Sequence, residues 1–121
     1  MIDRPLKILV VDDQIHRHVN FLRWLRDHVI VNAGSYKEAV EALNTGSPYD
    51  VVYLDYDLGT WENGADVASY IISLPTAKWP QRVIIHSLHP IGVLRIRRIL
   101  SRVQIPNQIE PHGFDFQSLK L

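Results

Sequence analysis

The chain has 121 residues, of which 46% are hydrophobic and 21% charged, as is typical of one soluble globular domain. Thirteen Lys and Arg residues balance thirteen Asp and Glu residues, so the overall charge does not favour binding to nucleic acid or to a membrane surface. The absence of cysteine excludes disulfide bonds, a thiolate nucleophile and cysteine-ligated metals. No apolar run approaches the length of a membrane span and no signal-peptide pattern is present, so we expect a single cytoplasmic domain over residues 1–121.

The first predicted element is a buried strand at residues 7–11, which is apolar, rich in β-branched residues and followed directly by Asp12 and Asp13. A helix is predicted next, from about residue 15 to residue 28. Its expected core face consists of apolar residues at i, i+3 and i+4 spacings: Ile15, Val19, Leu22, Leu25 and Val29.

A short second strand is predicted at residues 29–31. Ser35 and Glu38 have the spacing of a capping box, which predicts a second helix that ends at Gly46. The third predicted strand spans residues 50–54.

Two acids spaced i, i+2, Asp55 and Asp57, follow this third strand, and a polar loop leads to a helix at residues 65–74. A fourth apolar run over residues 82–85 ends at His86 and Ser87.

Pro90 suits the first turn of a following helix, where its missing N–H group costs nothing. Residues 108–110 predict a brief edge strand, and residues 114–121 are too short for a confident helix. Strands and helices therefore alternate, which predicts a three-layer α/β sandwich with a parallel sheet in the flavodoxin-like order 2-1-3-4-5 and a reduced fifth β/α unit.

Four carboxylates are expected to converge where the strand order reverses: Asp12, Asp13, Asp55 and Asp57. Carboxylates this close repel one another unless a cation shares the space. Oxygen ligands without a thiolate favour Mg²⁺ or Mn²⁺ over zinc. The alternative is that some of these acids cap helices or face water, and Asp13, which precedes a helix, is the first candidate for a cap.

With Asp12 and Asp13 after the first strand, Asp55 after the third and Ser87 after the fourth, the chain resembles a response-regulator receiver (CheY-like) domain. The resemblance implies a phosphoryl acceptor at Asp55, metal ligands at Asp12 and Asp13, and a switch hydroxyl at Ser87 that contacts the phosphoryl group. It also implies that Asp57 supplies a backbone carbonyl to the metal.

The chain departs from the receiver pattern at the end of the fifth strand. Receivers carry a lysine there that clamps the phosphoryl oxygens, whereas this chain has Glu110, and an anion would repel the group. Either another cation replaces the lysine, with His86, His89 and His112 as candidates, or ordinary phosphorelay is not the function.

Residues 54–59 together with residues 86–92 resemble the cyclic-phosphate-processing branch of receivers, which carries an LD-x-DLG turn and an HS-x-N-P-x-G segment. Here His89 stands in place of the usual asparagine, and Tyr56 stands where histidine is common. The resemblance implies action on cyclic phosphate ends of RNA or nucleotides.

We therefore predict an atypical receiver-like domain that processes or senses phosphate groups, as a candidate metal-dependent cyclic phosphate hydrolase. In this hypothesis the four acids hold the ion, His86 shuttles a proton and Ser87 positions an oxygen. The expected partner is a phosphate-bearing small molecule or an RNA end; a protein partner stays open, and the sequence shows no motif for DNA or membranes. The alternative is an orphan receiver phosphorylated at Asp55, or a pseudo-receiver that works through protein contacts.

Overall fold

The computed structural model describes residues 4–110. This part of the chain contains five β-strands, four α-helices and one short 3-10 helix. In chain order they are β1 (Lys7–Val11), α1 (Ile15–Trp24), β2 (Val29–Ala33), α2 (Tyr36–Gly46), β3 (Val51–Leu54), α3 (Gly64–Ser73), η1 (Thr76–Lys78), β4 (Arg82–Ile85), α4 (Pro90–Ser101) and β5 (Asn107–Ile109).

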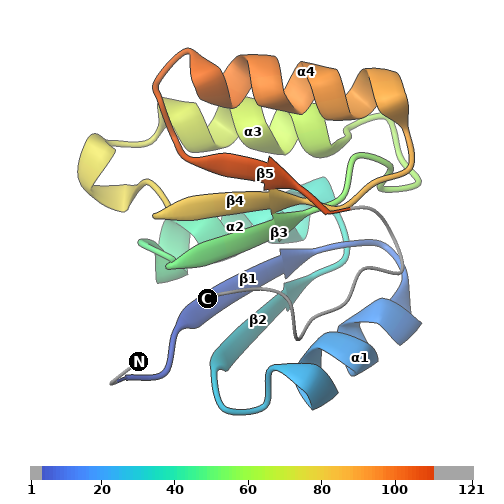
Figure 1. The fold of residues 1–121 in the computed structure, drawn as a ribbon, viewed down its shortest axis with the longest axis vertical. Coiled ribbons are helices and arrows are strands. Elements are labelled where there is room, and N and C mark those ends of the chain that lie inside the picture. The colour runs from blue at the N-terminus through green and yellow to red at the C-terminus, as the bar shows by residue number, and fades with distance from the viewer. Residues whose placement is uncertain (1–3, 111–121) are drawn as a thin grey trace.

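The strands form one sheet in the order β2-β1-β3-β4-β5, and every neighbouring pair is parallel (Figure 1). This confirms the predicted order 2-1-3-4-5. The chain adds β2 on one side of β1 and β3 on the other, so the strand order reverses between β1 and β3. The carboxyl ends of these two strands, where ligands bind in open α/β sheets, are therefore neighbours.

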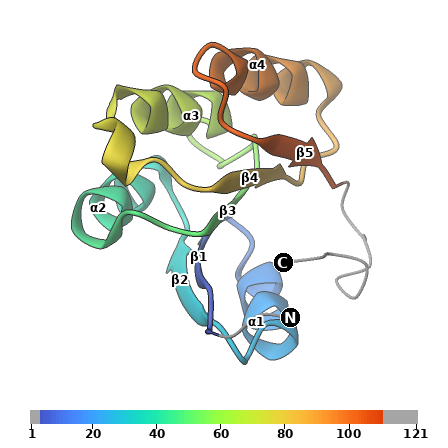
Figure 2. The same ribbon diagram turned by 60° about the vertical axis from the view of Figure 1, so that its left-hand side comes forward.

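Helices cover both faces of the sheet: α2, α3 and α4 lie on one side and α1 lies on the other (Figure 2). Because strand side chains alternate, each strand contributes to both layers of the core. In β3, Val52 and Leu54 belong to the cluster under α2, α3 and α4, whereas Val51 and Tyr53 pack with Phe21 of α1. This two-sided burial explains why the central strand β3 is apolar without interruption.

The predicted core face of the first helix was wrong except at Leu25. Phe21 and the following Leu25 are buried, whereas Ile15, Val19 and Leu22 are exposed. The helix is turned about its axis so that Phe21 packs on Tyr53, with ring centroids 4.7 Å apart. One large aromatic side chain thus outweighs the more regular aliphatic pattern, because an aromatic ring buries more apolar area.

Capping residues set the starts of α2 and α3. Ser35 accepts a hydrogen bond from the Glu38 N–H at 3.1 Å, as predicted, but the Glu38 carboxylate accepts from the Gly34 N–H instead of completing the capping box. The full capping box belongs to α3, where Asn63 and Asp66 bond to each other's backbone N–H groups. The sequence predicted a polar loop before this helix, so the capping role of Asn63 was not predicted.

The reduced end of the fold is confirmed as far as the described residues reach. β5 has three residues, and the Glu110 N–H extends it by donating to the Ile85 carbonyl at 2.8 Å. The candidate cation His112 and the uncertain element at residues 114–121 lie outside the described residues. Within residues 4–110, no helix combines the length and apolar character needed to cross a bilayer.

Candidate functional site

Four polar residues form a row along the carboxyl edge of the sheet, each directly after its strand. Asp12, Asp55, His86 and Glu110 continue the parallel ladder, because each donates its backbone N–H to the neighbouring strand. The bonds are Asp12 N to Ala33 O at 3.0 Å, Asp55 N to Val11 O at 3.0 Å, His86 N to Leu54 O at 3.1 Å and Glu110 N to Ile85 O at 2.8 Å. The sheet itself therefore fixes the backbones of these residues side by side.

The pleat of the strands sorts the polar side chains of this edge between the two faces. Asp12 and Asp55 are in phase with Val10 and Tyr53, two buried residues on the α1 side of the sheet. Asp13, one residue further along, is in the opposite phase. The switch in strand order brings all of these groups to one edge.

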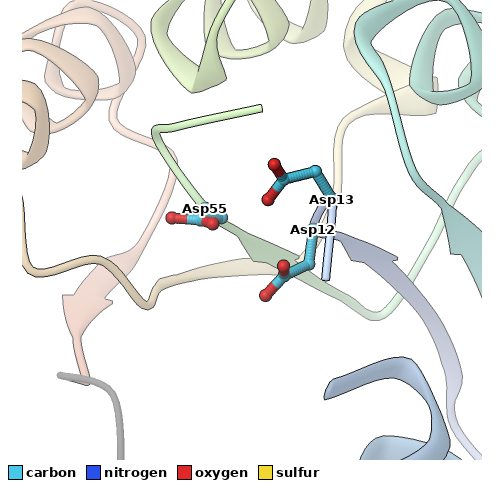
Figure 3. A group of neighbouring side chains, drawn as sticks. All are labelled: Asp12, Asp13 and Asp55. Carbon is cyan, nitrogen blue, oxygen red and sulfur yellow. The ribbon is translucent and has the colours of Figure 1, made fainter. Parts of the chain in front are cut away.

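Carboxylate oxygens of Asp12, Asp13 and Asp55 all lie within 4.8 Å of one another. Figure 3 shows the three side chains extending from the ends of β1 and β3 into the same region. Asp12 and Asp55 are buried and Asp13 is half-buried. Three hard oxygen donors at this spacing fit a divalent cation of the Mg²⁺ or Mn²⁺ type, since these ions prefer carboxylate and carbonyl ligands.

Asp57 does not belong to this tight group. Its side chain is exposed, and its carboxylate accepts a long 3.5 Å bond from the Gly59 N–H. Asp57 still lines the pocket in front of the cluster. A ligand role for its carboxylate stays a prediction, and so does a ligand role for its backbone carbonyl.

Asp13 does not cap the first helix, so this part of the alternative is wrong, whereas the exposed Asp57 does face water. The N-cap position is Gln14, whose side chain makes no capping bond. The Gln14 backbone N–H donates instead to Oδ1 of Asp12 at 2.8 Å. Asp12 Oδ1 is thereby engaged, and Oδ2 is the oxygen that faces the other charged groups.

Burial, with repulsion from Asp12 as the second cause, raises the pKa of Asp55 to about 7. The Arg17 guanidinium opposes the shift, and repulsion from Asp13 adds to it. A full negative charge on Asp55 is therefore costly near neutral pH unless a cation compensates for it.

Arg17 is the functional residue that sequence analysis missed. Its Nη1 lies 3.1 Å from Asp12 Oδ2 and 3.4 Å from Asp55 Oδ2, so one guanidinium bridges both carboxylates. The side chain reaches the cluster from the first turn of α1. The signal available in the sequence was its position five residues after Asp12, at the start of a helix that begins at this edge of the sheet.

His86 lies behind the acids, on the α1 side of the sheet. The ring is buried, with Nδ1 3.6 Å from Asp12 Oδ2. It packs edge-on against Phe21 and Tyr53, with centroid distances of 5.6 and 6.1 Å. His86 is not among the described residues that line the pocket, so its contact with the site runs through Asp12.

A pocket of about 410 Å³ opens in front of the acids. It is lined by residues that follow β1, β3 and β4: Asp13, Gln14, Arg17, Asp55, Asp57, Gly59, Ser87, Leu88 and His89. The Ser87 hydroxyl lies at this wall and accepts a hydrogen bond from the His89 N–H at 3.2 Å. Because the hydroxyl oxygen is the acceptor in this bond, the hydroxyl proton can point toward an oxygen of a ligand. Asp55 and Ser87 thus meet at one pocket, as predicted.

The β4–α4 segment is joined to the acidic turn through Tyr56. Its ring lies against His89 with centroids 4.7 Å apart, and its hydroxyl accepts a bond from Arg95 at 2.8 Å. Gly92 is needed at this contact, because a Cβ atom there would lie 2.3 Å from the Tyr56 ring. His89 caps α4 by accepting from the Gly92 N–H at 2.9 Å, so this N–H is not available to an anion.

Glu110 stays apart from the pocket. Its carboxylate accepts a hydrogen bond from the Gln108 side chain at 3.1 Å, and it is not among the described residues that line the cavity. Within residues 4–110, the end of β5 therefore presents no cation there, whereas Arg17 contacts the acids from α1.

Comparison with known proteins agrees with this architecture. Residues 7–102 match the family model described as the cyclic-phosphate processing receiver domain. No curated protein matches the sequence significantly.

Three solved structures illustrate the fold. A CheY-like receiver domain from Methylobacillus flagellatus is 19% identical, with a TM-score of 0.76, covering 96% of this chain and 93% of that one. The phosphorylated cyanobacterial phytochrome response regulator RcpA is 21% identical, with a TM-score of 0.70 and coverage of 87% and 79%. The receiver domain of NtrX from Brucella abortus is 23% identical, with a TM-score of 0.70 and coverage of 89% and 87%. Likeness at this level of identity shows the fold alone.

Proposed function

Because the chain belongs to the family of cyclic-phosphate processing receiver domains, we propose that it opens cyclic phosphates at the ends of nucleotides or RNA with the help of a divalent cation. The observation that carries the proposal is the convergence of Asp12 with Asp13 and Asp55, since the latter two line a pocket together with Ser87. The carboxylates suit a divalent ion, and the Ser87 hydroxyl suits a phosphate oxygen.

The reaction is a hydrolysis. Water adds to phosphorus, the bond from phosphorus to one ribose oxygen breaks, and that oxygen takes up a proton, so the product is a phosphate monoester. Mg²⁺ or Mn²⁺ held by the three acids would supply the positive charge that stabilises the phosphoryl oxygens. The Ser87 hydroxyl can donate a hydrogen bond to one of these oxygens. Protons exchange with water through the open pocket.

In this proposal His86 acts as a positioning residue. Its Nδ1 approaches Asp12 Oδ2, and the rings of Phe21 and Tyr53 hold the imidazole in place. The contact fixes the carboxylate that would bind the ion. No contact among the described residues supports a direct proton transfer from His86 to the substrate, because the ring contacts Asp12 and does not line the pocket.

The test is hydrolysis of a 2′,3′-cyclic nucleotide with Mg²⁺ or Mn²⁺, followed by chromatography of the monoester product. We expect turnover by the natural protein and a loss of roughly 100-fold or more for Asp12→Asn, which keeps the bond to Gln14 but removes the charge. His86→Asn should lose rate mainly through metal affinity, so excess Mn²⁺ should restore it. Failure of excess metal to restore the rate would favour the proton-shuttle role.

A second candidate function is phosphorylation of Asp55. It is favoured by the position of Asp55 after β3, facing the same pocket as Ser87. Incubation with Mg²⁺ and a small acyl phosphate should then add one phosphoryl group, detected by intact mass, and Asp55→Asn should abolish the addition. An inert cyclic nucleotide together with a labelled Asp55 would favour this function. If neither reaction occurs and metal still binds, a module that works through protein contacts is favoured.

A further inference from the structure

Arg17 occupies the place that a metal ion would need. We propose that Arg17 is the resident cation of the pocket: it neutralises Asp12 and Asp55 before a divalent ion binds, and then turns to hold the phosphate of the ligand. This inference rests on the proposed function, because it assigns the residue that recognises the phosphate group.

The competition between the two cations follows from the contacts of Asp12. Its Oδ1 accepts the Gln14 N–H, so Oδ2 is the oxygen that faces the cluster. Arg17 Nη1 lies 3.1 Å from this same oxygen and 3.4 Å from Asp55 Oδ2. An ion at about 2.0–2.6 Å from these oxygens would take the space and the charge that the guanidinium now uses. Metal binding must therefore weaken both contacts of Arg17.

A phosphate needs a cation that the other described residues of the pocket wall do not provide. Among the described lining residues, Arg17 is the only Lys or Arg, whereas three are acids: Asp13, Asp55 and Asp57. The His89 Nδ1 accepts the Gly92 N–H, and Glu110 brings a negative charge to the end of β5. An Arg guanidinium matches phosphate oxygens with two parallel N–H donors.

Arg17 is well placed to change partners. It lies in the first turn of α1, and about a quarter of its side chain, 26%, is exposed to solvent. It lines the pocket as well as touching the acids behind it. Rotation of its long side chain can therefore carry the guanidinium from Asp12 to a ligand in the pocket, without any movement of the helix.

The test compares the natural protein with Arg17→Gln and Arg17→Lys, and uses Arg23→Gln as the matched control. Arg23 lies on the same helix, in its last turn, and is exposed. Calorimetry measures Mn²⁺ binding first, and then the binding of inorganic phosphate at saturating Mn²⁺. Thermal unfolding of each variant checks that it is folded.

Arg17→Gln should move the two affinities in opposite directions. We expect Mn²⁺ to bind at least about fivefold more tightly, because its competitor is gone, and phosphate to bind about tenfold more weakly, because one charge-assisted hydrogen-bond partner is lost. Arg17→Lys should fall between the natural protein and Arg17→Gln in both measurements, because an ammonium group keeps the charge but not the two parallel donors, and Arg23→Gln should not change either.

Weaker phosphate binding without tighter Mn²⁺ binding would overturn the exchange of partners, as would an unchanged phosphate affinity. Absence of Mn²⁺ binding in all the proteins would overturn it together with the metal site. Opposite shifts in a protein that hydrolyses no cyclic nucleotide would support the role of Arg17 and reject the proposed reaction. Hydrolysis with neither shift would reject the role of Arg17 alone.

Discussion

The carboxyl group of Asp55 lies where a negative charge is costly. It is buried at the end of β3, with Asp12 beside it and Asp13 within reach, and these surroundings raise its pKa to about 7. Arg17 offsets part of this cost. A residue in such a position is suited to bind a cation, because the cation relieves a repulsion that already exists in the folded protein.

The raised pKa of Asp55 predicts the pH dependence of stability. In the unfolded chain Asp55 loses its proton near its ordinary pKa of 3.8, whereas in the folded protein it keeps the proton up to about pH 7. The folded state binds more protons between these values, so the contribution of Asp55 to stability is full below pH 3.8 and is lost as the pH rises toward 7.

Asp55→Asn should therefore flatten the fall in unfolding free energy between about pH 4 and pH 7. Without divalent ions it should also stabilise the protein at pH 8, by an amount of the order of a few kcal/mol. Denaturant unfolding across this pH range is the measurement, with the exposed Asp27→Asn as the control. A variant that follows the natural protein at every pH would contradict the assignment.

Gly92 offers a second test at the scale of single residues. A methyl group at this position would collide with the Tyr56 ring, so Gly92→Ala should cost about 1–3 kcal/mol despite the better helix propensity of alanine. In a Tyr56→Ala background the ring is absent, and the same substitution should become neutral or stabilising by up to about 1 kcal/mol. A double-mutant cycle with no coupling would show that the ring and the glycine do not depend on each other.

At the scale of elements, α1 shows what the sequence could and could not predict. Its existence and start were predictable from the periodic pattern. Its rotation about its own axis was not, because that depends on which side chains find partners on the sheet. Phe21 fills the space beside Tyr53, and Arg17 reaches the acids, so the aliphatic stripe containing Val19 and Leu22 faces outward. The same rotation hid Arg17 from sequence analysis.

Alanine substitutions on α1 test this rotation directly. Phe21→Ala removes a buried ring from the α1-side core and should lower the unfolding free energy by about 3–5 kcal/mol. Leu22→Ala, at the neighbouring half-exposed position, should cost less than about 1 kcal/mol. Equal costs in a chemical denaturation series would mean that the helix presents a different face to the sheet.

The strands were predicted more completely than the helices, because their signals are local. β1, β3 and β4 are short, mainly apolar runs that end at polar residues, and parallel ladders bring such ends to the same edge. Asp55 and Ser87 therefore line one pocket as expected, and Asp12 lies beside Asp55 at the same edge of the sheet. The alternation of side chains between the two faces of the sheet also follows from the sequence. His86 lies on the α1 side with Asp12 and Asp55, whereas Ser87, the next residue, is in the opposite phase.

At the scale of the whole molecule, the site combines a receiver-type sheet edge with a different source of positive charge. The acids and Ser87 come from β1, β3 and the end of β4, as the receiver resemblance implied. The cation that contacts the acids comes from α1, whereas Glu110, which follows β5, stays apart from the pocket. Since the fold positions these groups through strand order and helix rotation, the chemistry of the pocket can differ from that of other receivers while the backbone stays the same.

The central claim is that Asp12, Asp13 and Asp55 hold one divalent cation, and Mn²⁺ binding measured by calorimetry at pH 8 tests it most directly. At this pH the carboxyl group of Asp55 is mostly ionised, since its pKa is raised to about 7. We predict binding of one ion by the natural protein and by Asp27→Asn, and a loss of at least about tenfold in affinity for Asp12→Asn. Equal affinity for Asp12→Asn and the natural protein, or no binding by either, would contradict the account.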